Sequence, residues 1–193
     1  MPTQTYKSID ELSSDTFTTP ALTLLTKINI PYTKRVYGYV PHGGAAASSA
    51  ALNVPYHWVI KTLIFTIRDR NQLICVLMHG DCNVDTNKLC KQLNVKKISM
   101  TPEHDAEAAT GYLVGGTSPF ALKHNIPVYI QKSIVDGHKD SDSHVNDIDR
   151  SKPSTVLING GARGMLIEMT VNDIVNVLQP TIVDVAKLAK PKS

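Results

Sequence analysis

Lys61 is the charged residue of this sequence that is best placed to do chemistry, because it lies inside the apolar segment 58–67 (WVIKTLIFTI). If this segment is a β-strand, alternate residues share a face, and Lys61 lies in a row with Val59, Leu63 and Phe65. Burial of an unpaired ammonium group is costly. Two interpretations follow. Either the lysine reaches from the edge of the strand to water, or it lines the mouth of a pocket and holds an anion or an electron-rich oxygen of a substrate.

The segment 111–119 (GYLVGGTSP) is the second candidate, because it concentrates glycine in a chain that has only 11 glycines. It is not a phosphate-binding P-loop, since no Gly-Lys-Ser/Thr follows, and it does not match the GxGxxG pattern. Gly115 and Gly116 lack a Cβ, so a ligand can approach their N–H groups closely, and Pro119 stiffens the exit of the loop. The segment is either a plain connector or a loop whose amides stabilise the charge that develops on a carbonyl oxygen.

A second glycine segment, 159–164 (NGGARG), precedes an expected strand. It is either the turn of a hairpin or a second wall of the same pocket, with Arg163 available for a phosphate. The HGG sequence at 42–44 resembles the oxyanion motif of lipases, but the chain has no GxSxG nucleophile motif, so we set a serine hydrolase aside.

The cysteines and histidines do not form a recognisable metal motif. The chain has three cysteines, at positions 75, 82 and 90. Their odd number and their spacing fit neither a disulfide framework nor a zinc ribbon, so we expect reduced thiols. His138 and His144 lie among aspartates in the polar segment 136–154, which we interpret as a solvated surface insertion. We expect no metal and no cofactor.

The composition is that of a globular protein, with 193 residues, of which 42% are hydrophobic and 19% are charged. No apolar run approaches the ~18 residues of a transmembrane helix. Residues 1–17 lack the features of a targeting segment and are expected to form a polar, partly ordered arm. The expected reduced thiols indicate a cytoplasmic protein. The formal net charge is +3, and lysines gather at 88–97 and 187–192. These two groups are either solvated faces or a surface that contacts phosphates.

Helices and strands are intermixed along the chain without strict alternation, which indicates an α+β fold with a mixed sheet that is either open or curled into a barrel. Thr19, Asp85 and Thr170 have the positions of helix N-caps. The apolar spacing predicts helices over 20–28, 45–52, 85–93, 101–109, 171–178 and 182–189. Strands are predicted over 32–39, 58–67, 73–78, 96–99, 111–114, 127–131, 155–158 and 164–169.

Four stretches resemble, in the same order, the YbaK family of aminoacyl-tRNA deacylases. They are TPALTLLTKINIPYTKRVY, VIKTLIF, TGYLVGGTSPF and NGGARGMLIEM, and they cover most of residues 18–178. Members of this family are free-standing relatives of the editing domain inserted in bacterial prolyl-tRNA synthetase. The resemblance implies a mixed, barrel-like β core flanked by helices, with residues 18–193 as a single deacylase domain. It also implies trans-editing hydrolysis of a mischarged tRNA, typically Cys-tRNA(Pro), since cysteine is too close to proline in size for a synthetase pocket to reject it strongly.

The resemblance also assigns roles to residues. Lys61 matches the essential lysine of the family and would position the 3′-terminal phosphate or ribose of the tRNA. Gly115 begins the GxxxP loop, whose backbone would hold the aminoacyl ester, Tyr37 matches a pocket tyrosine, and Thr62 follows the lysine. In the members that act on Cys-tRNA, the thiol of the substrate attacks its own ester carbonyl, so no protein nucleophile is needed. The remaining residues assigned to substrate binding are Gly116, Thr117, Ser118, Pro119, Asn159, Gly160 and Leu166.

The sequence departs from the family pattern at two pocket positions and in one connection. Leu166 stands where the members that act on Cys-tRNA have an aspartate, Asn159 stands where they have a serine, and segment 136–154 is longer than usual. Three functions therefore remain open: a Cys-tRNA(Pro) deacylase, a deacylase for Ala-tRNA or Ser-tRNA with water as the nucleophile, and a non-catalytic module. The expected partners are the acceptor end of an aminoacyl-tRNA and prolyl-tRNA synthetase, without a membrane or DNA partner.

Overall fold

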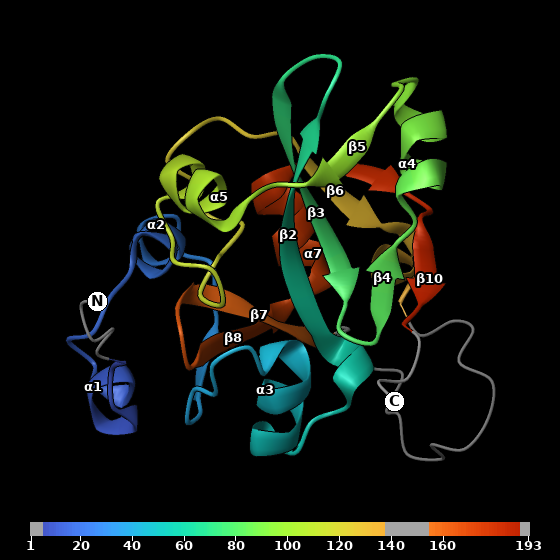
Figure 1. The fold of residues 1–193 in the computed structure, drawn as a ribbon. Coiled ribbons are helices and arrows are strands. Elements are labelled where there is room, and N and C mark those ends of the chain that lie inside the picture. Colours follow the sequence, from blue (N-terminus) through green and yellow to red (C-terminus); the bar gives the residue numbers. More distant parts are fainter. Residues whose placement is uncertain (1–5, 138–154, 190–193) are drawn as a thin grey trace.

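A large mixed β-sheet forms the centre of the protein, and helices flank it (Figure 1). The computed structural model describes residues 6–137 and 155–189. The helices are α1 (Ile9–Ser13), α2 (Pro20–Lys27), α3 (Gly44–Leu52), η1 (a 3-10 turn, Tyr56–Trp58), α4 (Thr86–Leu93), α5 (Glu103–Thr110), α6 (Lys132–Asp136) and α7 (Val171–Leu178). The strands are β1 (Thr33–Val36), β2 (Val59–Ile67), β3 (Gln72–His79), β4 (Cys82–Val84), β5 (Ile98–Met100), β6 (Val128–Gln131), β7 (Thr155–Ala162), β8 (Met165–Thr170), β9 (Thr181–Val183) and β10 (Ala186–Leu188).

The sheet follows the order β1-β8-β7-β2-β3-β6-β9, and β5 also pairs with β2. Parallel pairs (β2 with β7, β3 with β6) and antiparallel pairs (β2 with β3, β7 with β8) occur side by side, which confirms the predicted mixed sheet. β4 and β10 form a separate two-stranded sheet. In the described part of the chain no pairing joins β1 to β9, so the strand order does not close on itself.

The central strand β2 has a gap along one of its edges. On one side it pairs with β3 over residues 60–67. On the other side β7 pairs only with Val59 and Ile60, and β5 pairs only from Phe65 to Ile67. The backbone of residues 61–63 therefore faces a space without a neighbouring strand, and this space holds the candidate site.

The two faces of β2 pack into two different hydrophobic clusters, as period-two alternation predicts. Ile60 and Ile64 belong to the larger cluster, together with Leu22, Leu25 and other residues. Phe65 and Ile67 belong to a second cluster that includes Leu89 of α4. β2 is thus held by packing on both faces, which fixes the positions of Lys61 and Thr62 in its middle.

The three predicted N-caps are confirmed. The Thr19, Asp85 and Thr170 side chains accept hydrogen bonds from backbone N–H groups in the first turns of α2, α4 and α7. The predicted arm contains α1, and Leu12 in this helix is buried in the larger cluster. Of the predicted insertion 136–154, only Asp136, which ends α6, and Gly137 lie within the described residues.

Two predicted elements are wrong. Residues 111–114 are not a strand, because Gly111 ends α5 with a left-handed backbone (φ 78°) and the chain turns there. Residues 182–189 are not a helix but contribute β9 and β10. Val183, which ends β9, and Val185, which precedes β10, are both buried, whereas Ile182 is 52% exposed. The prediction of a helix from the apolar spacing assumed that Ile182 is a core residue, and this assumption led to the error.

No helix in the described ranges is long and apolar enough to cross a membrane.

Candidate functional site

A cavity of about 600 Å³ occupies the gap beside β2. The walls come from β2, the segment before α3, the loop after α5 and the β7–β8 hairpin, so segments far apart in the sequence meet there. The residues assigned to the site from the sequence that line this cavity are Tyr37, Lys61, Thr62, Gly115, Thr117, Asn159 and Leu166. Segment 159–164 thus satisfies both interpretations, because it forms the bend of a hairpin and also a wall of the cavity.

Lys61 is half-buried on the cavity wall, and its ammonium group donates a hydrogen bond to the backbone carbonyl of Cys82. Burial lowers the pKa of Lys61, while the nearby Cys82 and Asp81 side chains act in the opposite direction. The side chain does not simply extend into water from the edge of the strand. The structure therefore favours the pocket interpretation of this lysine.

Gly115 adopts a conformation that only glycine accommodates easily. Its φ is +88°, and a Cβ at this position would lie 2.6 Å from the Tyr39 hydroxyl oxygen. Its carbonyl accepts a hydrogen bond from the Asn159 side-chain amide at 3.2 Å. The Gly115 N–H donates a hydrogen bond to no acceptor in the described part of the chain. This donor at the cavity wall therefore remains available to a ligand.

Arg163 holds the loop that contains Gly115. Its Nε donates to the Val114 carbonyl at 2.8 Å, and its guanidinium lies 3.9 Å from the Glu107 carboxylate. The Arg163 side chain is only 11% exposed. The arginine that was a candidate for binding phosphate therefore fixes the backbone of the 111–117 loop.

Thr62 and Tyr37 supply hydroxyl groups to the site. The Thr62 Oγ1 atom is buried, and within the described residues it has no hydrogen-bond partner. Burial raises the pKa of the Tyr37 hydroxyl, which hydrogen bonds with Ser48. An unsatisfied buried hydroxyl is unusual in a folded protein and marks a position where a ligand can supply the missing partner.

Four residues assigned to substrate binding from the sequence do not line the cavity. The Gly116 N–H already donates to the Leu113 carbonyl at 2.8 Å, and a Cβ on Gly116 would lie 2.7 Å from the backbone nitrogen of Arg163. Ser118 is buried, and its hydroxyl accepts from the Phe120 N–H, which turns the chain. The others are Pro119, which is buried, and Gly160, where a Cβ would meet Met165 at 2.9 Å. These residues shape the loop and the hairpin rather than the cavity surface.

Two aromatic residues of the wall were missed by the sequence reasoning. The rings of Tyr6 and Tyr39 lie 5.0 Å apart, and both line the cavity. The Arg163 guanidinium lies over both rings, at 5.8 Å and 5.6 Å from their centroids. Tyr6 comes from the segment predicted to be a polar arm, and no local pattern indicates that it reaches the site.

Comparison with known proteins places this site in a family. Residues 41–140 match the model of the aminoacyl-tRNA editing domain. A protein of Enterococcus faecalis named for a proposed Cys-tRNA(Pro)/Cys-tRNA(Cys) deacylase activity, EbsC, is 26% identical over 78% of this chain and 82% of its own length. The proline–tRNA ligase of Desulfovibrio desulfuricans is 27% identical over 56% of this chain, but this match spans only 19% of the ligase.

Solved structures share the fold. A candidate trans-editing enzyme for prolyl-tRNA synthetase superposes with a TM-score of 0.69 at 14% identity, over 89% of this chain and 99% of that protein. The hypothetical protein APE2540 superposes with a TM-score of 0.72 at 19% identity, over 88% of this chain and all of that protein. Together with the sequence match over 41–140, these findings confirm the predicted resemblance: the chain belongs to the aminoacyl-tRNA editing domain family.

Proposed function

We propose that this protein, an aminoacyl-tRNA editing deacylase by its family, removes cysteine from mischarged Cys-tRNA(Pro) in trans. The observation that carries the proposal is the meeting of the Lys61 side chain and the available Gly115 N–H on the walls of one cavity of about 600 Å³. A cavity of this size holds an aminoacyl group with part of the terminal ribose. The relative of Enterococcus faecalis named for a Cys-tRNA deacylase activity supports the same substrate.

In this mechanism the protein supplies geometry and electrostatic stabilisation. The Gly115 N–H donates to the ester carbonyl oxygen as negative charge develops on it. Lys61 leaves the Cys82 carbonyl and holds the terminal phosphate or a ribose oxygen of the tRNA. The sulfur of the bound cysteine attacks its own ester carbonyl, so that an S–C bond forms, the ester C–O bond breaks, and the ribose oxygen leaves as a hydroxyl with the proton of the thiol. The cysteine is then a cyclic thioester, which water hydrolyses to free cysteine. Orientation of such an intramolecular attack can contribute as much as about 7–11 kcal/mol.

A second candidate substrate follows from Leu166. This residue is buried against Tyr37, Val59 and Leu157, so this wall of the cavity is apolar. An apolar wall also suits a small aliphatic aminoacyl group such as alanyl. Without a substrate thiol, a water molecule beside Gly115 has to make the attack.

A panel of deacylation assays separates these candidates. We expect the protein to hydrolyse Cys-tRNA(Pro) faster than Ala-tRNA(Pro) or Ser-tRNA(Pro). Hydrolysis of Ala-tRNA(Pro) without hydrolysis of Cys-tRNA(Pro) overturns the cysteine assignment and leaves a deacylase. The absence of hydrolysis with all three, in a preparation that binds tRNA, favours the non-catalytic module.

Thr62 allows a test in which stability and activity move in opposite directions. In Thr62→Val the unsatisfied hydroxyl is replaced by a methyl group of similar shape, so we expect the free energy of unfolding to rise by about 1 kcal/mol. The kcat/KM for deacylation should fall by about three- to tenfold, the value of one hydrogen bond to the substrate. Urea denaturation and single-turnover assays measure the two effects.

Thr66 is the matched control on the same strand. Its hydroxyl forms a buried hydrogen bond with Thr101 at 2.8 Å, so Thr66→Val should lower the free energy of unfolding by about 1–3 kcal/mol. If both variants are destabilised equally, the Thr62 hydroxyl has a partner in the folded protein and the assignment fails.

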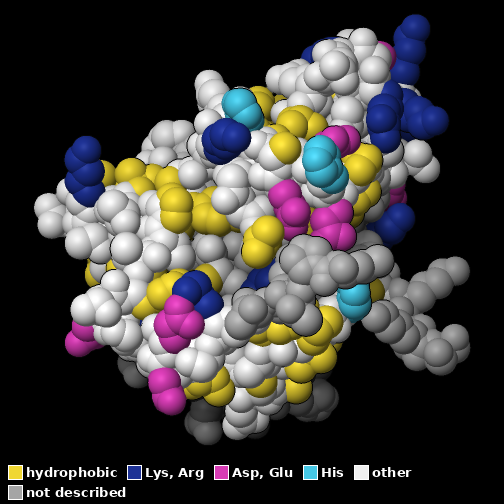
Figure 2. Space-filling model, turned by 60° about the vertical axis from the view of Figure 1, so that its left-hand side comes forward, with side chains coloured by type: hydrophobic (Ala, Val, Ile, Leu, Met, Phe, Trp, Pro, Cys, Tyr) yellow, Lys and Arg dark blue, Asp and Glu magenta, His cyan; other side chains and the backbone are white. Residues whose placement is uncertain are grey.

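A basic surface at one end of the sheet is the proposed docking site for the tRNA backbone. It consists of Arg68, Arg70, Lys96 and Lys97, which are all exposed. The β2–β3 turn and the α4–β5 connection are joined there, because Arg70 donates to the Asn94 carbonyl at 3.3 Å and the Arg68 N–H donates to the Lys97 carbonyl at 2.9 Å. Figure 2 shows Lys and Arg side chains gathered at the upper right of the face that it presents.

We expect the affinity for tRNA to fall steeply as salt increases. Arg70→Ala and Lys96→Ala should weaken binding and reduce the slope of log K against log salt by about 1 for each phosphate that the variant no longer neutralises. Lys27→Glu, on α2 outside this surface, serves as the control. An unchanged slope in both alanine variants contradicts the docking surface.

The proposal also includes a partner and a location. The partner is prolyl-tRNA synthetase, and the location is the cytoplasm, which suits the three free thiols.

A further inference from the structure

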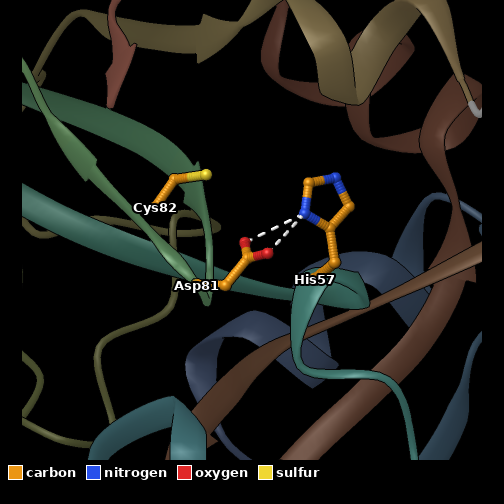
Figure 3. A group of neighbouring side chains, drawn as sticks. All are labelled: His57, Asp81 and Cys82. Atoms are coloured by element: carbon orange, nitrogen blue, oxygen red, sulfur yellow. Dashed lines mark hydrogen bonds and ion pairs between the residues drawn. The ribbon is translucent and has the colours of Figure 1, made fainter. Parts of the chain in front are cut away.

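Three side chains that can bind a metal converge near Lys61, whose ammonium group donates to the Cys82 carbonyl, and none of the three lines the cavity. His57 lies in η1, Asp81 in the turn between β3 and β4, and Cys82 at the start of β4 (Figure 3). The His57 Nδ1 lies 2.9 Å from each carboxylate oxygen of Asp81. One ring nitrogen of His57, a carboxylate oxygen of Asp81 and the Cys82 sulfur all lie within 4.8 Å of one another.

The surrounding packing fixes the positions of these ligands. The His57 ring stacks on the His79 ring with centroids 3.6 Å apart, and the His79 Nδ1 donates to the His57 backbone carbonyl at 2.9 Å. Gly80 allows η1 to approach this turn, since a Cβ on Gly80 would lie 2.4 Å from the Tyr56 carbonyl oxygen. Side chains that are oriented before a ligand arrives lose little conformational freedom when they bind it.

We propose that His57, Asp81 and Cys82 form a zinc-binding site with one coordination position open to solvent. An imidazole nitrogen, a carboxylate oxygen and a thiolate sulfur are all ligands of zinc, and the thiolate distinguishes it from magnesium and calcium. In a tetrahedral zinc site a nitrogen and an oxygen ligand lie about 3.3 Å apart. The His57 and Asp81 atoms, now 2.9 Å apart, therefore need to separate by only about 0.4 Å.

Charge and access also suit a dication. The Asp81 carboxylate and the Cys82 thiolate together carry the two negative charges that balance Zn²⁺, and coordination removes the thiol proton. The positive charge of the nearby Lys61 ammonium group opposes the binding of a cation. However, Lys61 donates its hydrogen bond to the backbone carbonyl of Cys82 and not to the sulfur, so the sulfur remains available to the metal. The His57 and Asp81 side chains are 41% and 34% exposed, whereas Cys82 is buried, so the metal enters from the solvent side.

The sequence prediction of no metal site depended on the spacing of the cysteines. That rule cannot find this cluster, because His57 lies 24 residues before Asp81 and only the fold brings the two together. The proposal is also independent of the deacylase activity, since its test is the binding of a metal by the protein without tRNA.

The test uses the full chain without a histidine tag. The protein is dialysed against zinc or cobalt(II), and the bound metal is measured by mass spectrometry. We expect one zinc per chain and, with cobalt(II), a near-ultraviolet charge-transfer absorption that reports a thiolate ligand. Cys82→Ser should abolish this absorption, and His57→Gln and Asp81→Asn should weaken zinc binding by more than about tenfold.

Two controls distinguish this site from other ligands in the chain. Cys90→Ser, on α4, should keep both the stoichiometry and the absorption. A chain with His138→Gln and His144→Gln should also keep them. Thermal unfolding of each variant without metal checks that it is folded. The absence of stoichiometric metal in the wild-type chain, binding that survives Cys82→Ser, or binding that instead disappears when His138 and His144 are replaced each overturns the proposal.

Discussion

Lys61→Ala should lower the kcat/KM for deacylation by about 100- to 1,000-fold, the effect of removing one preorganised donor from an active site. Lys61 is half-buried on the cavity wall, and a backbone carbonyl holds its ammonium group in place. The residue is on the strand that packs into both hydrophobic clusters, but its own side chain contributes little to either. The loss should therefore appear in catalysis and not in the free energy of unfolding.

Single-turnover deacylation and urea denaturation of the same preparations measure the two quantities. Lys27→Ala, which changes an exposed lysine on α2, is the control and should retain the wild-type rate. The variant also separates an enzyme from a binding module. The basic surface around Arg70 is intact, so tRNA affinity should fall only by the loss of the single Lys61 contact, which is far less than the fall in kcat/KM. Retention of the wild-type kcat/KM in Lys61→Ala would remove this lysine from the mechanism.

Elements with strong local signals were predicted correctly from the sequence. α2, α4 and α7 each begin with a side chain that accepts hydrogen bonds from the first turn, and these caps could be identified from residue type and position alone. β2 was identified by its apolar length and by alternation. Lys61 followed from the same pattern, because a charge in an apolar row is visible without any tertiary information.

The remaining parts depend on contacts between distant segments. β9 and β10 have only three residues each and become strands because they pair with β6 and β4, so their helical spacing misled the prediction. Tyr6 reaches the cavity because its ring packs against Tyr39 and Arg163, which are far along the chain. Gly116 was assigned to the ligand because glycine permits close approach, and Gly160 was assigned from the family resemblance, but the group that approaches each of them belongs to the protein itself.

The position of the site follows from the gap in the sheet. β7 and β5 each pair with only part of one edge of β2, and the segment between them exposes the backbone around Thr62 to a cavity instead of a strand. The same short segment of β2 presents the lysine and the unsatisfied hydroxyl. The 111–117 loop, held by Arg163, brings the Gly115 amide to the same cavity. The site is therefore built by an interruption of strand pairing.

Gly115→Ala should lower kcat/KM by about 100-fold or more, since it displaces the only amide proposed to contact the ester carbonyl oxygen. The alanine Cβ would lie 2.6 Å from the Tyr39 hydroxyl oxygen, and a φ of +88° is strained for any residue with a Cβ. The backbone strain alone costs about 1–2 kcal/mol. Gly38→Ala is the matched control, because nothing lies within 4 Å of a Cβ at Gly38, and it should keep the wild-type rate.

A double-mutant cycle with Tyr39→Phe separates the two causes of this loss. Removal of the hydroxyl takes away the closest contact and leaves ring carbons at 3.3 Å from the new Cβ, so part of the activity should return in Gly115→Ala/Tyr39→Phe relative to Gly115→Ala. The remaining deficit measures the displacement of the amide by the strained backbone, because φ is unchanged by the second substitution. If Gly115→Ala is as active as Gly38→Ala, the Gly115 amide does not stabilise the oxyanion, and the donor must then come from another part of the cavity wall, with Lys61 as the first candidate.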